Sequence, residues 1–275
     1  MFTDFNDQAA APPAAPSDRG DWTIPQDWAH FTAEDHRVWD VLFERQQRRL
    51  AGRVVSAFEH GLDILRLDRA GIPDFRELNA RLQPRTGWTV VAVPGLVPDD
   101  VFFRHLSERR FPAGNFIRSA AQLDYLEEPD VFHDVFGHVP MLADPATADF
   151  MQKLGQEGLR ALASGSIERL SRLYWYTVEF GLAREGGALK IYGAGLASSF
   201  GEAGFALDSE APTRLPFDLA EVMRTRYRSD RFQSRYFVID SFAGLLEDLL
   251  SADLDALYAA AARLPEIDPE LPRAA

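Results

Sequence analysis

Two histidines five residues apart in an apolar segment restrict how this chain can fold. His133 and His138 lie among Phe, Val and Leu within residues 122–145, and the chain has only six histidines. A regular helix turns by about 100° per residue, so side chains five positions apart point about 140° away from each other. Gly137 tolerates unusual backbone angles, and Pro140 cannot continue a helix. We therefore expect the chain to unwind near His138, so that both imidazoles face one point.

The histidine pair alone leaves two interpretations open. Two imidazoles in an apolar run are equally consistent with hydrogen-bonded core histidines and with metal ligands. A third ligand would decide, and Glu179 is the best candidate because it lies among aromatic and aliphatic residues. A carboxylate there is costly unless it is paired or bound to a cation. Two imidazoles and one carboxylate form the ligand set that holds non-haem Fe(II) and leaves positions open.

Three separated motifs carry a family resemblance. They are EPDVFHDVFGHVP, YWYTVEFGL and IYGAGLASSFGE, and they occur in this order in the chain. Together they resemble the pterin-dependent aromatic amino acid hydroxylases, most closely the single-domain bacterial phenylalanine 4-hydroxylases, from residue 22 to residue 262. The resemblance implies a mainly α catalytic domain with a few short strands around a central iron site. It also implies hydroxylation of L-phenylalanine to L-tyrosine with O2 and tetrahydrobiopterin at Fe(II), the first step of phenylalanine catabolism.

The resemblance also assigns roles to individual residues. It makes His133, His138 and Glu179 the iron ligands. The implied pterin contacts are Phe102, which would stack on the pterin ring, with Asp134 and Tyr174. Arg118 would pair with the substrate carboxylate, which suits the bidentate guanidinium group. The resemblance also implies that Trp175 and Phe180 contact the substrate and that Ser198 contacts its amino-acid end. Glu202 would lie around the active site without touching the substrate directly.

Two positions depart from the family pattern. Leu126 stands where family members often have a threonine near the substrate carboxylate, and Ser229 lies in the loop where the phenylalanine, tyrosine and tryptophan enzymes differ. Substrate preference is therefore less firmly implied than the type of reaction.

Two other functions use the same residues: a zinc hydrolase with an activated water, and a non-catalytic sensor of aromatic amino acids. The hydrolase would need a general base and an oxyanion stabiliser, and the sequence identifies neither.

Composition narrows the setting. The chain has 275 residues, with 29 basic and 42 acidic side chains and a net charge of −13, which disfavours nucleic acid and anionic membranes as partners. It has no cysteine, so only nitrogen and oxygen ligands are available. No apolar run approaches the roughly 20 residues of a membrane helix, and the N-terminus lacks signal-peptide features. We expect a cytoplasmic monomer whose pterin is regenerated by a recycling enzyme of the same pathway.

Local signals predict the domain limits and several elements. The Ala- and Pro-rich residues 1–21 read as a disordered tail, and residues 22–275 as one catalytic domain without a regulatory domain or tetramerisation helix. Helix-capping residues are Thr32 with Asp35, Asp74, Asp144 and Ser166. Strands are expected at residues 87–95 and 235–239, and residues 189–195 should form a strand followed by a turn. The helix after Ser166 should reach Gly186, a helix at residues 54–65 should stop near Gly61, and one long helix should run from Asp240 to about Leu264.

Overall fold

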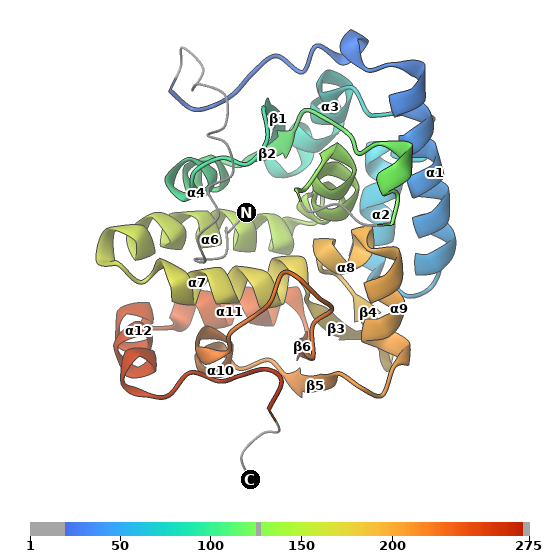
Figure 1. Ribbon diagram of the computed structural model, residues 1–275. Coiled ribbons are helices and arrows are strands. Elements are labelled where there is room, and N and C mark those ends of the chain that lie inside the picture. The colour runs from blue at the N-terminus through green and yellow to red at the C-terminus, as the bar shows by residue number, and fades with distance from the viewer. Residues whose placement is uncertain (1–19, 125–127, 272–275) are drawn as a thin grey trace.

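The computed structural model describes residues 20–124 and 128–271, and Figure 1 shows the arrangement of its elements. Most of the described chain is helical, as the sequence predicts. The α-helices are α1 (Ala33–Leu50), α2 (Ser56–Leu65), α3 (Phe75–Thr86), α4 (Asp99–Ser107), α5 (Val139–Leu142), α6 (Pro145–Ser164), α7 (Ile167–Tyr174), α8 (Ala194–Ser198), α9 (Phe200–Asp208), α10 (Leu219–Arg224), α11 (Phe242–Ser251) and α12 (Leu254–Arg263). Short 3-10 turns occupy η1 (Trp28–His30) and η2 (Ala120–Gln122), and two π-helices occupy η3 (Phe132–His138) and η4 (Trp175–Glu179).

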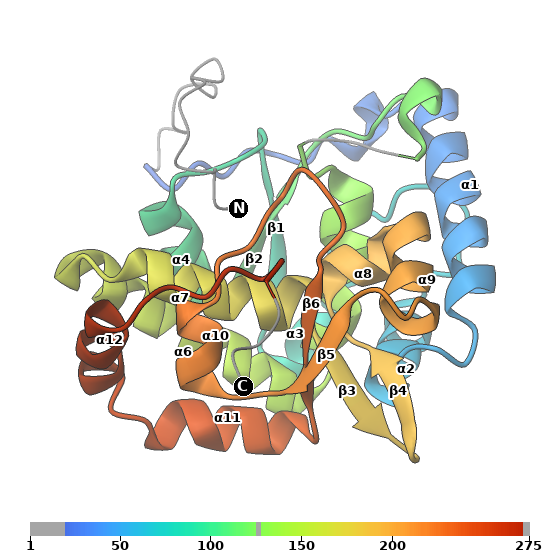
Figure 2. The same cartoon turned by 60° about the horizontal axis from the view of Figure 1, so that its bottom comes forward.

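In the described part of the chain, six short strands form two sheets. Strands β1 (Thr89–Val93) and β2 (Arg110–Gly114) pair in parallel. The second sheet has the order β4-β3-β6-β5, with β3 (Leu182–Glu185), β4 (Ala188–Ile191), β5 (Thr213–Pro216) and β6 (Arg235–Ile239). In this second sheet β3 and β4 pair antiparallel, whereas β3 with β6 and β5 with β6 pair in parallel. Figure 2 shows the β3–β4 hairpin at one edge of the molecule, beside β6 and β5.

The capping signals are largely confirmed. Thr32 and Asp35 form a capping box at the start of α1. Asp74 and Asp144 accept backbone N–H groups at the starts of α3 and α6, and Pro145 occupies the first helical position of α6. Ser166 lies at the N-cap of α7, but its side chain makes no capping hydrogen bond. These caps fix where the long helices begin, and the helices then bury one face in a common core.

Two predicted helix ends are wrong. The helix after Ser166 ends at Glu179 and not at Gly186, because residues 182–185 pair as β3 while Gly186 and Gly187 turn the hairpin with positive φ. Helix α2 continues past Gly61 to Leu65. A Cβ at Gly61 would lie 2.1 Å from the Pro140 carbonyl oxygen, which explains why this position is glycine. Glycine here serves close packing of α2 on α5 and does not end the helix.

The predicted C-terminal helix is two helices. Helix α11 ends at Ser251, and Asp253 caps α12 by accepting the Ala256 N–H at 3.0 Å. Helix α11 packs on α6, while α12 packs against α10 (Figures 1 and 2). Within the described ranges, no helix combines the length and the apolar character that crossing a bilayer requires.

Helices α4 and α6 approach closely, and this contact positions one wall of the site. Added Cβ atoms at Gly155 and Gly158 of α6 would lie 2.4 Å from the Ser107 amide and 2.1 Å from the Phe103 ring. The absence of these side chains lets α4 lie against α6 with Phe103 fully buried between them. Phe102, the next residue before Phe103, is thereby held toward the interior beside Tyr174.

Candidate metal centre

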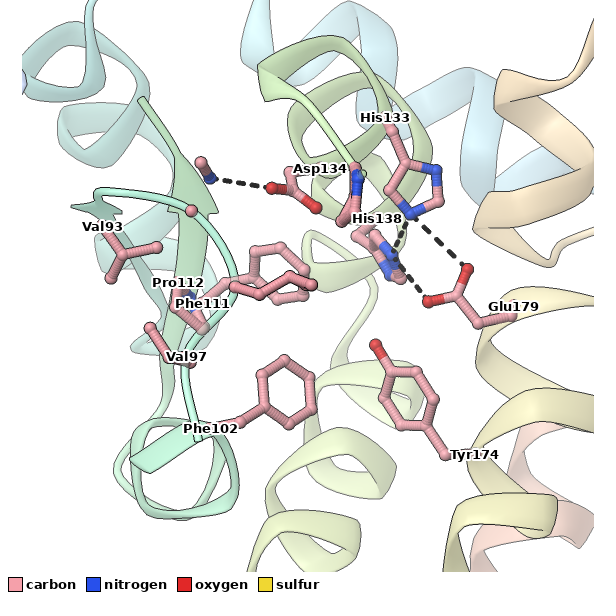
Figure 3. Close-up of a pocket in the computed structure, with 14 residues that line it drawn as sticks. Val93, Val97, Phe102, Phe111, Pro112, His133, Asp134, His138, Tyr174 and Glu179 are labelled. Atoms are coloured by element: carbon pink, nitrogen blue, oxygen red, sulfur yellow. Dashed lines mark hydrogen bonds and ion pairs between the residues drawn. The ribbon is translucent and has the colours of Figure 1, made fainter. Parts of the chain in front are cut away.

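The predicted metal ligands converge. The Nε2 atoms of His133 and His138 are 3.3 Å apart, and the Glu179 oxygens lie 3.6 Å and 3.2 Å from them, respectively. Donor atoms at these separations are spaced like neighbouring ligands of one ion with bonds of about 2.1 Å. Figure 3 shows the three side chains pointing at one another from η3 and from the end of η4. All three are buried.

The two π-helices solve the spacing problem posed by His133 and His138. A π-helix closes its hydrogen bonds from residue i to residue i+5, so residues five apart lie one above the other. Segment η3 contains both histidines, and η4 ends at Glu179, after which the Phe180 N–H donates to the Trp175 carbonyl at 2.9 Å. The expected unwinding near His138 is therefore wrong: the helix widens, and Pro140 lies in the first turn of α5, where proline is tolerated.

Hydrogen bonds set the tautomer of His133. The Ser198 hydroxyl donates to the Ala194 carbonyl at 2.8 Å and lies 2.8 Å from His133 Nδ1. Because its proton is used on Ala194, the Ser198 hydroxyl accepts a hydrogen bond from Nδ1–H of His133. The lone pair of Nε2 is then directed at the space between the three predicted ligands. Ser198 therefore contacts the predicted ligand His133, whereas its predicted contact with the amino-acid end of a substrate stays a prediction.

The protonation states suit a cation. Burial lowers the pKa of His133 to about 4, so its imidazole is neutral. Burial opposes ionisation of Glu179, but the imidazoles of His138 and His133 outweigh it and lower the carboxyl pKa to about 2. Among the described residues, Glu179 Oε2 and His138 Nδ1 have no hydrogen-bond partner although both are buried. A buried, ionised and unpartnered carboxylate oxygen is costly, and a bound metal ion would satisfy it.

A hollow of about 420 Å³, part of which is open to solvent, adjoins the predicted ligands. The predicted pterin contacts Phe102, Asp134 and Tyr174 line it together with the three ligands. The Phe102 and Tyr174 rings meet edge to face at 5.6 Å (Figure 3). Burial, and then the charges of Glu179 and Asp134, raise the pKa of Tyr174 well above its usual value, so its phenol stays protonated. Aromatic walls beside converging polar groups are typical of a cofactor or ligand site.

Asp134 lies on the cavity side of η3. Its Oδ2 accepts the Gly114 N–H at 2.8 Å, which ties η3 to the end of β2. Burial raises the pKa of Asp134 to about 7, and the Gly114 hydrogen bond offsets only part of this rise. His133, Asp134 and His138 also bring ligand atoms within 4.8 Å of one another. The Asp134 carboxyl group therefore lies beside the predicted metal ligands.

The predicted substrate residues lie outside this cavity. Its described lining includes none of Arg118, Trp175, Phe180 or Ser198. Arg118 is buried and uses Nε and Nη2 on Asp130, at 2.8 Å and 2.9 Å. Trp175 stacks on Tyr227, with centroids 4.2 Å apart and planes at 15°, and contacts Phe180 at 4.7 Å. Leu126 lies outside the described residues.

Several site residues escaped the sequence analysis. Phe111 and Gly114 belong to β2, a strand that was not predicted, and the Phe111 ring lies 4.8 Å from the His138 ring. Val97 in the loop before α4 also lines the cavity. Gln233 accepts the Trp175 indole N–H at 3.0 Å. No local pattern marks these residues, because strand pairing and loop packing bring them to the site.

Comparisons with known proteins agree with this geometry. The sequence profile of the biopterin-dependent aromatic amino acid hydroxylases matches residues 19–253. The chain belongs to this family. It is 58% identical to a phenylalanine-4-hydroxylase of Caulobacter vibrioides, with 92% of this chain and 85% of the relative covered. It is 51% identical to that of Chromobacterium violaceum, with coverages of 88% and 81%.

Solved structures of family members share the fold. The iron- and phenylalanine-bound phenylalanine hydroxylase of Chromobacterium violaceum matches with a TM-score of 0.88 and 46% identity, covering 94% of this chain and 93% of that one. The cobalt-bound form of the same enzyme matches with a TM-score of 0.90 and 48% identity, covering 93% and 92%. The mainly helical single-domain fold predicted from the motifs is thereby confirmed.

Proposed function

We propose that this chain is a phenylalanine 4-monooxygenase that converts L-phenylalanine to L-tyrosine with O2 and tetrahydrobiopterin at Fe(II). The observation that carries the proposal is the convergence of His133, His138 and Glu179 beside an aromatic-walled cavity. Family membership and the iron- and phenylalanine-bound relative support it. When bound, iron and tetrahydropterin together supply the oxygen activation and the two electrons that place one oxygen atom on the ring.

The protein residues bind and orient the reactants. His133, His138 and Glu179 would hold the metal on one face and leave the other face open. Phe102 would stack on the pterin, with Tyr174 and Asp134 completing the cavity wall. The protonated Tyr174 phenol can donate a hydrogen bond there, and the Asp134 carboxyl group lines the same cavity. Buried, preorganised groups of this kind position reactants at no later cost in reorganisation.

A second set of residues would hold the amino acid. Arg118 would bind the substrate carboxylate while Asp130 fixes the orientation of its guanidinium group. Trp175 and Phe180, whose rings are in contact, would hold the aromatic side chain. Ser198 would act at the amino-acid end and, through His133, at the metal. Glu202 would support these residues without touching the substrate. Its carboxylate accepts hydrogen bonds from the Gln233 N–H and the Tyr236 hydroxyl.

The setting follows from the same proposal. We propose a cytoplasmic monomer without nucleic-acid or membrane partners, supplied by a pterin-recycling enzyme and acting in the first step of phenylalanine catabolism. Residues 1–21 would be a dispensable tail and residues 22–275 the catalytic domain. Removing residues 1–19, which lie outside the described ranges, should leave turnover unchanged. A large loss of turnover in the shortened protein would contradict this division.

The proposed reaction is tested with metal-stripped protein. Fe(II), O2 and a tetrahydropterin are added singly and together, and tyrosine formed from phenylalanine is measured by chromatography. Tyrosine should appear only with all three, and Glu179→Ala should abolish it, while the exposed Glu210→Ala should not. Tryptophan and tyrosine follow as substrates. No hydroxylation of any of the three, or turnover supported by Zn(II) alone, would refute the proposal.

A further inference from the structure

We infer that Gln233 is a positioning residue that sets the orientation of the Trp175 indole and so shapes the pocket for the substrate ring. This inference rests on the proposed function, in which Trp175 holds that ring. Gln233 lies in the loop between α10 and β6, which crosses in front of α7 in Figure 1. Its side chain is 4% exposed although the loop is at the surface. A glutamine buried this completely needs partners for all its polar atoms.

Those partners are all present. The Gln233 Nε2 group donates to the Arg228 carbonyl at 2.6 Å and to the Arg231 carbonyl at 3.2 Å. Its Oε1 accepts the Trp175 indole N–H at 3.0 Å. The side chain therefore uses both donor hydrogens within its own loop and its oxygen on the tryptophan. It links the surface loop directly to the π-helix that ends at Glu179.

The orientation of this amide is dictated by its surroundings. Turning it over would place an NH2 group against the indole N–H and an oxygen against two carbonyls, so every contact would become repulsive. The backbone is fixed as well, because the Gln233 N–H donates to Glu202 Oε1 at 2.8 Å. The same oxygen accepts the Tyr236 hydroxyl at 2.9 Å, which anchors Glu202 to β6. Gln233 is thus a rigid acceptor at one defined place.

The indole is held by its ring as well as by its N–H. Tyr227, from the same loop as Gln233, stacks on it at 4.2 Å, and Phe180 contacts it at 4.7 Å. Stacking restricts the tilt of the ring but permits rotation and sliding within its plane. The hydrogen bond to Gln233 removes that remaining freedom. An apolar residue at 233 would keep the stack and lose the in-plane orientation.

The hydrogen bond itself is tested by nuclear magnetic resonance. Full-length protein is labelled with 15N-tryptophan and loaded with diamagnetic Zn(II); its five tryptophans give five indole N–H signals. Trp175→Phe identifies the signal of interest by its disappearance. In Gln233→Leu this signal should move upfield and exchange with solvent at least tenfold faster, while the other four stay in place. Gln47→Leu, at an exposed position of α1, is the matched control and should change nothing.

The functional role is tested by steady-state kinetics with Fe(II), O2, a tetrahydropterin and phenylalanine. Gln233→Leu should lower kcat/KM by about tenfold, as expected when one buried N–H donor loses its acceptor. The change should appear mainly in KM and in the amount of tyrosine formed per tetrahydropterin oxidised. In a Trp175→Phe background, which has no indole N–H, the same substitution should lower kcat/KM by less than twofold.

The outcomes separate the two proposals. If Gln233 merely supports its loop, the losses from Trp175→Phe and Gln233→Leu will multiply, and the positioning role is refuted. An unshifted indole signal in Gln233→Leu also refutes it. Should Gln233→Leu unfold, Gln233→Met decides: it fills similar space without an amide oxygen, so an indole signal that stays at its wild-type position in that variant contradicts the inference. If wild-type protein forms no tyrosine, the proposed function fails, whereas the resonance experiment still reports on the contact.

Discussion

Replacing Asp130 by asparagine should strongly destabilise the fold. The Asp130 carboxylate is fully buried and accepts four hydrogen bonds: from Nε, Nη2 and the backbone N–H of Arg118, and from the His133 N–H. Burial alone would raise its pKa, but the Arg118 contacts outweigh burial and lower it. Each carboxylate oxygen faces two N–H groups. An asparagine NH2, whichever way it is turned, would therefore oppose two donors.

The magnitude follows from the charge left behind. Asp130→Asn removes the negative charge that pairs with Arg118, and breaking a buried ion pair in this way costs about 3–5 kcal/mol. Typical domains are stable by about 5–15 kcal/mol, so this is a large share. Arg118→Met should cost less, because Asp130 keeps the Arg118 and His133 backbone N–H groups as donors. The asymmetry distinguishes this explanation from a simple loss of one contact.

The assay is urea unfolding of metal-free protein followed by circular dichroism at pH 7.5. Metal is omitted because its binding would add its own stabilisation. Asp149→Asn, which breaks the solvent-exposed pair with Arg109, is the matched control and should cost less than about 1 kcal/mol. A loss below about 1 kcal/mol for Asp130→Asn, or a larger loss for Arg118→Met, would refute the reasoning.

Three further predictions use the same structure. Ser198→Ala should weaken metal binding about 10–100-fold in chelator competition, because His133 Nδ1 loses its partner; unchanged affinity would contradict the tautomer assignment. Gly61→Ala should lower the free energy of unfolding by about 1–3 kcal/mol, since its Cβ would meet the Pro140 carbonyl; a neutral result in urea would contradict the packing argument. Glu202 is buried with its pKa raised to about 7, so the folded state binds its proton more tightly than the unfolded state. The free energy of unfolding should therefore fall as pH rises from about 4.5 to 7, by up to roughly 3 kcal/mol. In Glu202→Gln this part of the pH dependence should vanish, and parallel stability curves of the two proteins would show the assignment to be wrong.

Local chemistry explains which parts of the fold were predictable. Capping by Thr32, Asp74 and Asp144 depends on residues within one turn, and these helix starts were predicted. The end of the helix after Ser166 depends on a distant partner, because Gly181 accepts N–H groups from residues 192 and 193 and Leu182 pairs with Val238. No pattern within residues 166–186 contains that information. The break at residues 252–253 similarly accompanies the docking of α11 and α12 on different helices.

In the candidate site, too, local sequence indicates the residues, whereas tertiary contacts determine how they are arranged. The candidate ligands could be chosen from the sequence because a carboxylate and a histidine pair are chemically conspicuous in apolar surroundings. How they meet was not, since the widening of η3 and η4 into π-helices is favoured only when tertiary contacts compensate for it. Gly137 contributes by packing: a Cβ there would lie 3.0 Å from the Ala194 carbonyl oxygen, so α8 can approach η3 closely. This approach brings Ser198 to His133. The geometry of the metal point therefore depends on α8 as much as on the motif that carries the histidines.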